Sequence, residues 1–417
     1  MADLVPRRIA GHAVEFLDAF RVVIVNGPRQ SGKTTLLQQL NACRGGTYLT
    51  LDDGALRAAA QADPESFVAD GAKPLMIDEI QRGGDDLVLA IKSTVDRSSG
   101  RGQFILAGST RFLTTPSLSE SLAGRAGVLE VWPFAQQELA GGSTSFLTRA
   151  FEDPESFRTV SRSGYGRADY FDVIVRGFYP ETMTMRSELA RAEWHSAYVQ
   201  SVIDTDIREM AKIDEPSSLR SLLRLAAAST GQEMNVVKTA SDLGLHRTTV
   251  NRYLGLLETV FLVRLLPAWS RNLNARAVRR PKLHVTDTGL AAHLLSVDAE
   301  GLAARVAPAR GALVETFIVN ELAKQATWSP FRLNLCHWRV SQGPEVDLVV
   351  ERTNGRVVGV EAKATDAVDL QDFKGLATLR DSLGDQFVHG FVLYTGARSL
   401  AFGDRLTALP ISALWDR

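Results

Sequence analysis

The clearest chemical signature in the sequence is a loop near the N-terminus with the spacing G-x-x-x-x-G-K-T. Its glycines allow backbone N–H groups to turn inward around phosphate oxygens, and the helix expected after it favours an anion at its N-terminus. Lys33 supplies a positive charge for the β- and γ-phosphates, and the Thr34 hydroxyl can ligate Mg²⁺. The residues predicted to bind a nucleotide are Gly27, Pro28, Arg29, Gln30, Ser31, Gly32, Lys33, Thr34 and Thr35. An apolar strand before the loop and a helix after it favour a nucleoside triphosphate site with Mg²⁺ over a glycine-rich turn that binds nothing.

Two acidic residues predict that the bound nucleotide is hydrolysed. Asp78 and Glu79 follow the apolar run Leu-Met-Ile at the carboxyl end of a predicted strand, where ligands bind in open α/β sheets. Asp78 can hold Mg²⁺ through water, and Glu79 can polarise the attacking water, which a site that only binds nucleotide would not need. The alternative interpretation is that the pair only caps a helix.

Two further residues are expected to take part in hydrolysis. Ser109 ends the apolar run 103–109 and is predicted to touch the γ-phosphate, and Thr110 is nearly as good a candidate. Arg125 lies just before the last predicted strand, where AAA-type ATPases present an arginine to the nucleotide of the neighbouring subunit. Self-association of the chain would follow from this role, whereas a solvated surface arginine is the alternative.

The elements that position these residues form an α/β domain over residues 1–140. Apolar, strand-like runs alternate with helical stretches, which predicts a parallel sheet covered by helices on both faces. These runs are residues 21–26, 47–53, 73–78, 103–109 and 128–134.

The middle of the chain carries a local excess of positive charge. Residues 217–282 contain eleven Lys and Arg against three Asp and Glu, which is a possible electrostatic footprint for nucleic acid. A predicted helix over 236–242 breaks at Gly244, a second helix begins near His246, and a β-branched stretch follows as a wing. This pattern predicts a winged helix over residues 217–280, after a linker and helical lid over residues 141–216.

Four side chains of the second helix are predicted to face DNA: Arg247, Thr248, Asn251 and Arg252. Arginine, asparagine and threonine are side chains that reach base edges and phosphates in a major groove. The alternative is that this helix contacts protein. The basic residues that follow support DNA binding through counterion release, although part of them can instead serve a domain junction. They are Arg271, Arg276, Arg279, Arg280 and Lys282.

Residues 281–417 contain an acidic set typical of metal-dependent nucleases. A turn at Asn354-Gly355 joins two predicted antiparallel strands, with Asp347 on the first strand and Glu361 and Lys363 on the second. Asp347 and Glu361 are predicted to bind Mg²⁺, Glu315 to complete the metal shell from a preceding helix, and Lys363 to orient or activate the attacking water. The alternative is a hairpin whose Glu and Lys only face solvent.

Composition limits the class of protein. The chain has 417 residues, of which 45% are hydrophobic and 23% charged, as in soluble globular proteins with two to four domains. Its two cysteines, Cys43 and Cys336, form no metal spacing and no disulfide framework, which suits a reducing cytosol. Because no apolar run approaches the length of a membrane span and no signal-peptide pattern begins the chain, we expect a cytoplasmic protein without a membrane partner.

Nearly the whole chain resembles a bacterial and archaeal family of AAA-type ATPases with a C-terminal DUF4143 region. The resemblance rests on the motifs GPRQSGKTT, LMIDEI, LAGST, LAGR, RGFYPE and PKLHVTDTGL and on the series E…EVDLVV…VEAKA. It implies ATP rather than GTP as the nucleotide, and a PD-(D/E)XK nuclease, or restriction-endonuclease-like, fold for the C-terminal part. The chain departs from the family pattern at Phe178, where a glycine is usual.

The sequence therefore favours an ATP-binding and ATP-hydrolysing protein that binds DNA through a winged helix and carries a Mg²⁺-dependent, nuclease-like C-terminal domain. The alternative is an ATP-dependent regulatory switch or protein remodeller whose nuclease fold is catalytically inactive.

Overall fold

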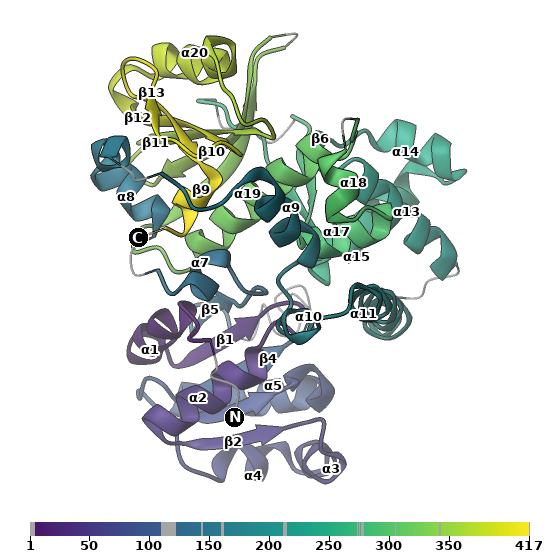
Figure 1. Cartoon of the computed structure of the whole chain (residues 1–417). Helices are drawn as coiled ribbons and strands as arrows, with labels where there is room; N and C mark the ends of the chain where they lie inside the picture. Colours follow the sequence, from purple (N-terminus) through teal and green to yellow (C-terminus); the bar gives the residue numbers. More distant parts are fainter. Residues whose placement is uncertain are drawn as a thin grey trace. The chain divides into compact units, whose positions relative to one another are not determined.

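The computed structural model divides the chain into two compact units (Figure 1). The first unit comprises Met1–Phe134 with Thr259–Phe261, and the second comprises Ala135–Glu258 with Leu262–Arg417. The four-segment division expected from the sequence stays a prediction. The structure describes residues 5–109, 122–142, 145–159, 162–211, 215–272, 274, 276, 279–304, 306–341 and 343–416.

The first unit is built on a parallel five-stranded sheet with the strand order β2-β3-β4-β1-β5. Strand β4 lies between β1, which leads into the phosphate-binding loop, and β3, which ends in Asp78. The elements of this unit are α1 (Ile9–Ala19), β1 (Val22–Asn26), α2 (Lys33–Arg44), β2 (Thr47–Thr50), α3 (Gly54–Ala62), α4 (Pro64–Ala69), β3 (Leu75–Asp78), η1 (Ile80–Gly83), α5 (Gly84–Arg97), β4 (Phe104–Gly108) and β5 (Ala126–Glu130).

Apolar residues bury both faces of this sheet, as expected for parallel strands between helices. All five residues of β1 are buried, and Val22 and Ile24 pack with apolar residues of α3, α4 and α5 in one core cluster. Helices α1 and α2 contact the strands but contribute nothing to that cluster, so they cover the opposite face. The last strand differs from the prediction, because it begins at Ala126 and ends at Glu130, opposite the last residue of β1.

The helical part of the second unit precedes a small sheet. Its elements are α7 (Gln136–Ala140), α8 (Phe146–Glu152), η3 (Pro154–Thr159), α9 (Arg167–Arg176), α10 (Pro180–Thr184), α11 (Glu188–Ser201), the π-helical turn η4 (Val202–Ile207), α12 (Arg208–Met210), α13 (Pro216–Ala228), β6 (Gln232–Glu233), α14 (Val236–Leu243), α15 (Arg247–Thr259), β7 (Val263–Leu266) and β8 (Lys282–Val285). Strands β6, β8 and β7 pair antiparallel in that order. Helix α14 ends at Gly244, whose left-handed φ of 65° suits glycine and lets the chain turn into α15.

The C-terminal part of the second unit is a mixed sheet with the order β13-β14-β12-β11-β10-β9. The hairpin predicted at Asn354-Gly355 is confirmed, since β10 and β11 pair antiparallel, whereas β12 joins β11 in parallel. The elements are α17 (Thr288–Leu295), α18 (Ala299–Ala303), α19 (Arg310–Thr327), β9 (Leu333–Arg339), β10 (Glu345–Arg352), β11 (Val357–Lys363), η5 (Leu370–Phe373), α20 (Lys374–Leu383), η6 (Gly384–Gln386), β12 (Phe387–Tyr394), β13 (Leu400–Ala401), β14 (Leu406–Pro410) and η7 (Ile411–Leu414).

Two helices hold this sheet between them. Residues Leu376, Leu379 and Leu383 of α20 share a core cluster with β9, β10, β11 and β12, whereas α19 contacts β10 and β11 from outside that cluster. Helix α19 and strands β10 and β11 carry the predicted acidic residues, so this packing decides how close those residues come. Among the described residues, no helix is long and apolar enough to cross a membrane.

Candidate functional site

The phosphate-binding loop connects β1 to α2 in the first unit, as predicted. Glycine is required at its start, because a Cβ at Gly27 would lie 2.1 Å from the backbone oxygen of Val131. Gly32 has a left-handed φ of 94°, which is also a glycine conformation. The Ser31 hydroxyl oxygen is buried without a hydrogen-bond partner in the described part of the chain. The loop thus has a polar atom without a partner and glycines that let a ligand approach the backbone closely, and both features fit a phosphate group.

Lys33 holds the loop in its present shape. Its Nζ donates hydrogen bonds to the backbone oxygens of Gly27, at 3.0 Å, and Pro28, at 2.8 Å. Phosphate oxygens are stronger acceptors for an ammonium group than peptide oxygens, because the bond is assisted by charge on both sides. The ammonium therefore lies at the loop, where it can exchange these contacts for those of a bound nucleotide.

Asp78 is the centre of the polar network next to the loop. The Thr34 hydroxyl donates to Asp78 Oδ2 at 2.6 Å, and the Glu79 backbone N–H donates to Oδ1 at 3.0 Å. Sequence reasoning missed Tyr48, whose hydroxyl donates to Asp78 Oδ2 at 3.1 Å. Burial and the Asp78 carboxylate raise the pKa of Tyr48 above its usual range, so its hydroxyl stays a donor. A hydroxyl and a carboxylate in contact are hard oxygen ligands, so Thr34 and Asp78 fit Mg²⁺.

Glu79 and Ser109 are joined by a residue that the sequence did not single out. The Gln81 amide donates to Glu79 Oε2 at 2.5 Å and to Ser109 Oγ at 3.2 Å. Burial raises the pKa of Glu79 above its usual value, although the Lys33 charge acts against this. A carboxylate with a raised pKa is a better proton acceptor, which suits a residue that polarises water. The other candidate, Thr110, lies outside the described residues.

Arg125 has a partner within its own unit. Its Nε and Nη2 donate to the two carboxylate oxygens of Asp96 at 2.5 and 3.0 Å, in a bidentate pair. The predicted action of Arg125 on the nucleotide of a neighbouring subunit stays a prediction, and this ion pair would have to open for it.

The four residues predicted to face DNA share one exposed side of α15. Val250, Tyr253, Leu254 and Leu257 form the buried side of the helix. The exposed side consists of Arg247, Thr248, Asn251 and Arg252.

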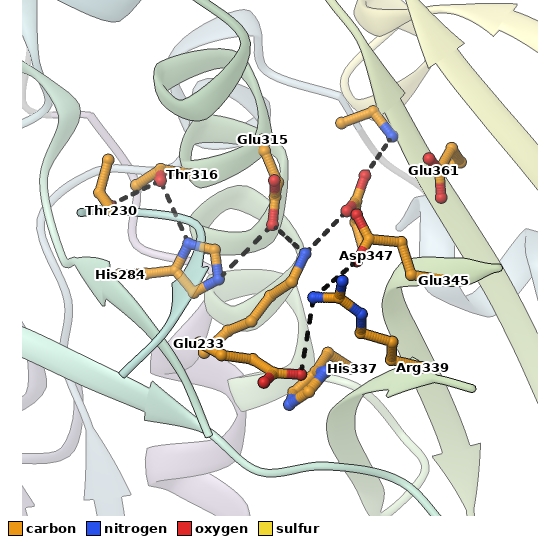
Figure 2. A network of polar contacts seen from close by, with 12 residues as sticks. Thr230, Glu233, His284, Glu315, Thr316, His337, Arg339, Glu345, Asp347 and Glu361 are labelled. Carbon is orange, nitrogen blue, oxygen red and sulfur yellow. Dashed lines mark hydrogen bonds and ion pairs between the residues drawn. The ribbon is translucent and has the colours of Figure 1, made fainter. Parts of the chain in front are cut away.

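A lysine lies within the predicted metal site of the C-terminal part, next to Glu315 and Asp347, which Figure 2 labels. Lys282, from β8, donates hydrogen bonds to Glu315 Oε1 at 2.8 Å and to Asp347 Oδ1 at 2.9 Å. All three side chains are buried or nearly so, with the lysine side chain only 5% exposed. Its ammonium occupies the place between two carboxylates where the sequence predicted Mg²⁺. No group of three or more His, Cys, Asp or Glu in the described residues could hold a metal ion.

The charges of this cluster are compensated internally. Burial alone would lower the pKa of Lys282, but the Asp347 and Glu315 carboxylates outweigh it and raise that pKa. Burial, with Asp347 beside it, raises the pKa of Glu315 to about 8. One ionised carboxylate suffices to neutralise one ammonium, so a second carboxyl that keeps its proton leaves the cluster neutral.

Glu361 and Lys363 lie on the same side of β11, as their spacing predicted, but they pair with each other. Lys363 Nζ donates to Glu361 Oε1 at 3.1 Å and lies 3.6 Å from an Asp372 carboxylate oxygen. Asp347 Oδ2 accepts a hydrogen bond from the Ala362 backbone N–H at 3.0 Å, which ties the two strands together. The set predicted as a nuclease centre therefore forms two ion-paired groups.

Some of the basic residues in the segment that was predicted to support DNA binding have partners inside the protein. Arg276 makes a bidentate pair with the Glu351 carboxylate, with Nη1 2.7 Å from Oε2 and Nη2 2.9 Å from Oε1. Arg271 donates to the Ser382 backbone oxygen. With Lys282 also buried, three of the five residues predicted to support DNA binding instead hold β7, β8 and their connection to the C-terminal sheet.

Three family models match the chain. One described as an AAA domain matches residues 19–140, a domain of unknown function (DUF8612) matches residues 167–301, and another (DUF4143) matches residues 310–414. The uncharacterized protein Rv2008c of Mycobacterium tuberculosis is 30% identical over 93% of this chain and 80% of its own length. An uncharacterized protein of Haemophilus influenzae is 24% identical over 68% of this chain and 71% of its own length. A solved structure, the Walker-type ATPase paby2304 of Pyrococcus abyssi, is 15% identical, with a TM-score of 0.41 over 70% of this chain and 96% of that chain.

Replacing the buried lysine tests the internal compensation of charge. Lys282→Met is expected to lower the free energy of unfolding by about 3–5 kcal/mol at pH 8, because it leaves two buried carboxyl groups without a cation. The loss should be smaller at pH 5. A carboxyl whose pKa is raised on folding, such as Glu315, stabilises the fold while it is protonated, and this contribution is lost as the pH rises through about 8.

Chemical denaturation at both pH values measures the effect. The exposed Lys374→Met serves as the control, and adding Glu315→Gln and Asp347→Asn to Lys282→Met should recover part of the lost stability. An equal loss at pH 5 and pH 8 would contradict the explanation.

Proposed function

This chain belongs to the family in which an AAA domain of the P-loop ATPase type precedes a C-terminal DUF4143 domain, and on this premise we propose that it binds ATP with Mg²⁺ and hydrolyses it. The observation that carries the proposal is the polar network beside the phosphate-binding loop. In it, Thr34 contacts Asp78, and Gln81 connects Glu79 to Ser109. Residues suited to hold Mg²⁺ and a residue suited to polarise water thus lie close together at the carboxyl edge of one sheet.

The proposed mechanism gives each residue of this network one task. Lys33 binds the β- and γ-phosphates after it exchanges its contacts with the loop backbone. Thr34 and Asp78 would hold Mg²⁺, which would neutralise charge on the phosphate oxygens. Glu79 polarises the attacking water, and Gln81 positions the Glu79 carboxylate relative to Ser109.

Glu79→Gln is expected to lower kcat for ATP hydrolysis by about 100-fold or more, because the amide cannot accept the proton of the water. ATP binding should change little, since Lys33 and Thr34 remain. Phosphate release measures hydrolysis, and a fluorescent ATP analogue measures binding. Gln81→Ala should lower kcat less and shift its pH profile, as expected for a positioning residue. Unaltered hydrolysis in Glu79→Gln would refute the assignment of the base.

Self-association through Arg125 is an extension of this proposal. An arginine supplied by a second copy of the chain would stabilise the negative charge of the transition state. The Asp96 carboxylate holds Arg125 in a bidentate pair, which would have to open first. Because the arginine would come from a second copy, a hydrolysis rate per chain that is independent of protein concentration would speak against this role.

We further propose that the segment from α13 to β8 is a winged helix that binds DNA through α15. Its order of elements is helix, strand, helix, helix, strand, strand, and β8 lies between β6 and β7 in the sheet. The exposed side of α15 carries two arginines, a threonine and an asparagine, which are suited to phosphates and base edges. The connection between β7 and β8 contributes less charge than expected, because Arg271 and Arg276 have internal partners.

Arg247→Ala and Arg252→Ala are each expected to weaken DNA binding and to reduce the slope of log affinity against log salt concentration by about 1, if each arginine contacts one phosphate. Fluorescence anisotropy with a labelled duplex over a salt series measures both. Arg356→Ala, an exposed arginine in the turn between β10 and β11, is the matched control. If neither α15 variant differs from wild type, the helix serves protein contacts.

For the C-terminal domain we propose a nuclease-like fold that does not cleave DNA. The proposed fold is supported by the order of helix α19, strands β9, β10 and β11, helix α20 and strand β12, with Asp347 on β10 and Glu361 and Lys363 on β11. The observation that favours inactivity is the Lys282 ammonium between Glu315 and Asp347. A cation already held there competes with Mg²⁺, and releasing it would leave buried charges unpaired.

The full chain is accordingly expected to show no Mg²⁺- or Mn²⁺-dependent cleavage of single-stranded, duplex or branched DNA, with or without ATP. Gel analysis of end-labelled substrates measures this. Cleavage by the wild type that is lost in Asp347→Ala would overturn the proposal and restore the nuclease interpretation.

A further inference from the structure

A cavity of about 360 Å³ in the second unit is lined by residues other than those of the phosphate-binding loop, the exposed side of α15 and the Lys282 cluster. Strand β9 and the end of the β7–β8 connection provide most of its polar lining, and β6 adds one acidic side chain. Its polar lining residues are Arg279, Arg280, His337, Arg339, Ser341 and Glu233. A volume of this size accommodates a mononucleotide, since small-molecule sites begin near 300 Å³.

The lining carries a surplus of positive charge. Three guanidinium groups face one carboxylate in this cavity. Arg339 lies 3.9 Å from Glu233 and 3.7 Å from Glu345, distances that are too long for hydrogen bonds (Figure 2). Within the part of the chain that the structure describes, Arg279 and Arg280 form no ion pair, although Arg279 Nη1 donates a long hydrogen bond of 3.4 Å to the Arg339 backbone oxygen. Arginine binds phosphate oxygens through paired N–H groups, so this lining suits a phosphate group.

His337 adds a polar atom that has no partner within the protein. Only 2% of this residue is exposed, and its Nε2 lies 3.1 Å from the Arg280 backbone oxygen, which can only accept. The proton is therefore on Nε2, and Nδ1 is an acceptor without a hydrogen-bond partner among the described residues. Burial lowers the pKa of His337, which keeps the ring neutral near neutral pH. Because the Nδ1 atom is closed to solvent, a ligand in the cavity would contact the arginine side chains and not this atom.

The backbone around the cavity is held in place. The His337 backbone N–H donates to the Pro267 oxygen at 2.9 Å, and the Trp269 N–H donates to the His337 oxygen at 2.6 Å. Arg276, which pairs with Glu351, and Lys282, which contacts Asp347, have fixed partners on either side of Arg279 and Arg280. Arg339 extends from strand β9, and positioning by regular structure limits the entropy lost when a ligand binds.

We propose that this cavity binds a nucleoside phosphate, with its phosphate on Arg279, Arg280 and Arg339. The ligand is either a free mononucleotide or the phosphorylated end of a nucleic-acid strand, because both present this chemistry. The site is separate from the phosphate-binding loop and does not depend on ATP hydrolysis.

The test uses trinucleotides, which are short compared with the DNA surface proposed for α15. Fluorescently labelled trinucleotides with a 5′-phosphate, a 3′-phosphate or only hydroxyl ends are titrated with the full chain, and anisotropy measures binding. AMP, which lacks the β- and γ-phosphates that Lys33 binds, is the competitor. At least one phosphorylated probe should bind about tenfold more tightly than the hydroxyl probe.

Variants assign the binding to this cavity. Arg279→Ala combined with Arg280→Ala should remove the preference for a terminal phosphate, whereas Arg356→Ala should keep it. Ser341→Ala is a milder second variant inside the cavity, in case the double variant perturbs the fold. The ATP hydrolysis rate should stay unchanged in all of them, which separates this inference from the proposed ATPase function.

The outcomes are distinct. Competition by AMP identifies a free nucleotide as the ligand, and binding of a phosphorylated trinucleotide without such competition identifies a strand end. Equal affinity for phosphorylated and hydroxyl probes, or a phosphate preference that survives in the Arg279 and Arg280 double variant, overturns the proposal.

Discussion

The Lys282 ammonium connects three elements of the second unit that are distant in the sequence. It extends from β8 and contacts Glu315 on α19 and Asp347 on β10, so the small sheet and the C-terminal sheet share one buried set of charges. A buried ammonium is tolerated only when carboxylates and hydrogen bonds replace the water that it loses. The positions of β8, α19 and β10 relative to one another are therefore constrained together, because moving one of them would leave a charge unpaired.

This constraint changes the interpretation of the basic middle segment. A surplus of lysine and arginine in a linear count indicates possible nucleic-acid binding, but charge that is neutralised within the fold contributes nothing to counterion release. Lys282 and Arg276 are neutralised by carboxylates of the C-terminal part, and Arg271 is bound to a backbone oxygen there. Exposed positive charge remains on α15 and around the cavity at Arg279 and Arg280, and also at Arg224 on α13 and Lys238 on α14.

The two acidic sites of the chain differ in the charge of the donors that contact their carboxylates. Beside the phosphate-binding loop, Asp78 accepts hydrogen bonds from neutral donors, the hydroxyls of Thr34 and Tyr48 and the backbone of Glu79. These donors carry no charge, and the nearby Lys33 ammonium donates to the backbone oxygens of Gly27 and Pro28. In the C-terminal part, Glu315 and Asp347 accept from a lysine that is already charged. The first set of contacts leaves the carboxylate with neutral partners, whereas the second already gives both carboxylates a positively charged partner.

The sequence by itself determined those features whose residues are close together along the chain. The phosphate-binding loop, the alternation of strands and helices in the first unit, the break at Gly244 and the hairpin at Asn354-Gly355 each depend on a few consecutive side chains and their backbone preferences. Only the tertiary structure decided that Gln81 connects Glu79 to Ser109, that Asp96 holds Arg125, and that Lys282 lies between two carboxylates. These partners come from different strands and helices, and their contact depends on strand order, register and helix packing. The predicted nuclease set had the expected residues on the expected strands, but no local pattern could indicate a lysine from a separate sheet, because burial in a common core brings it there.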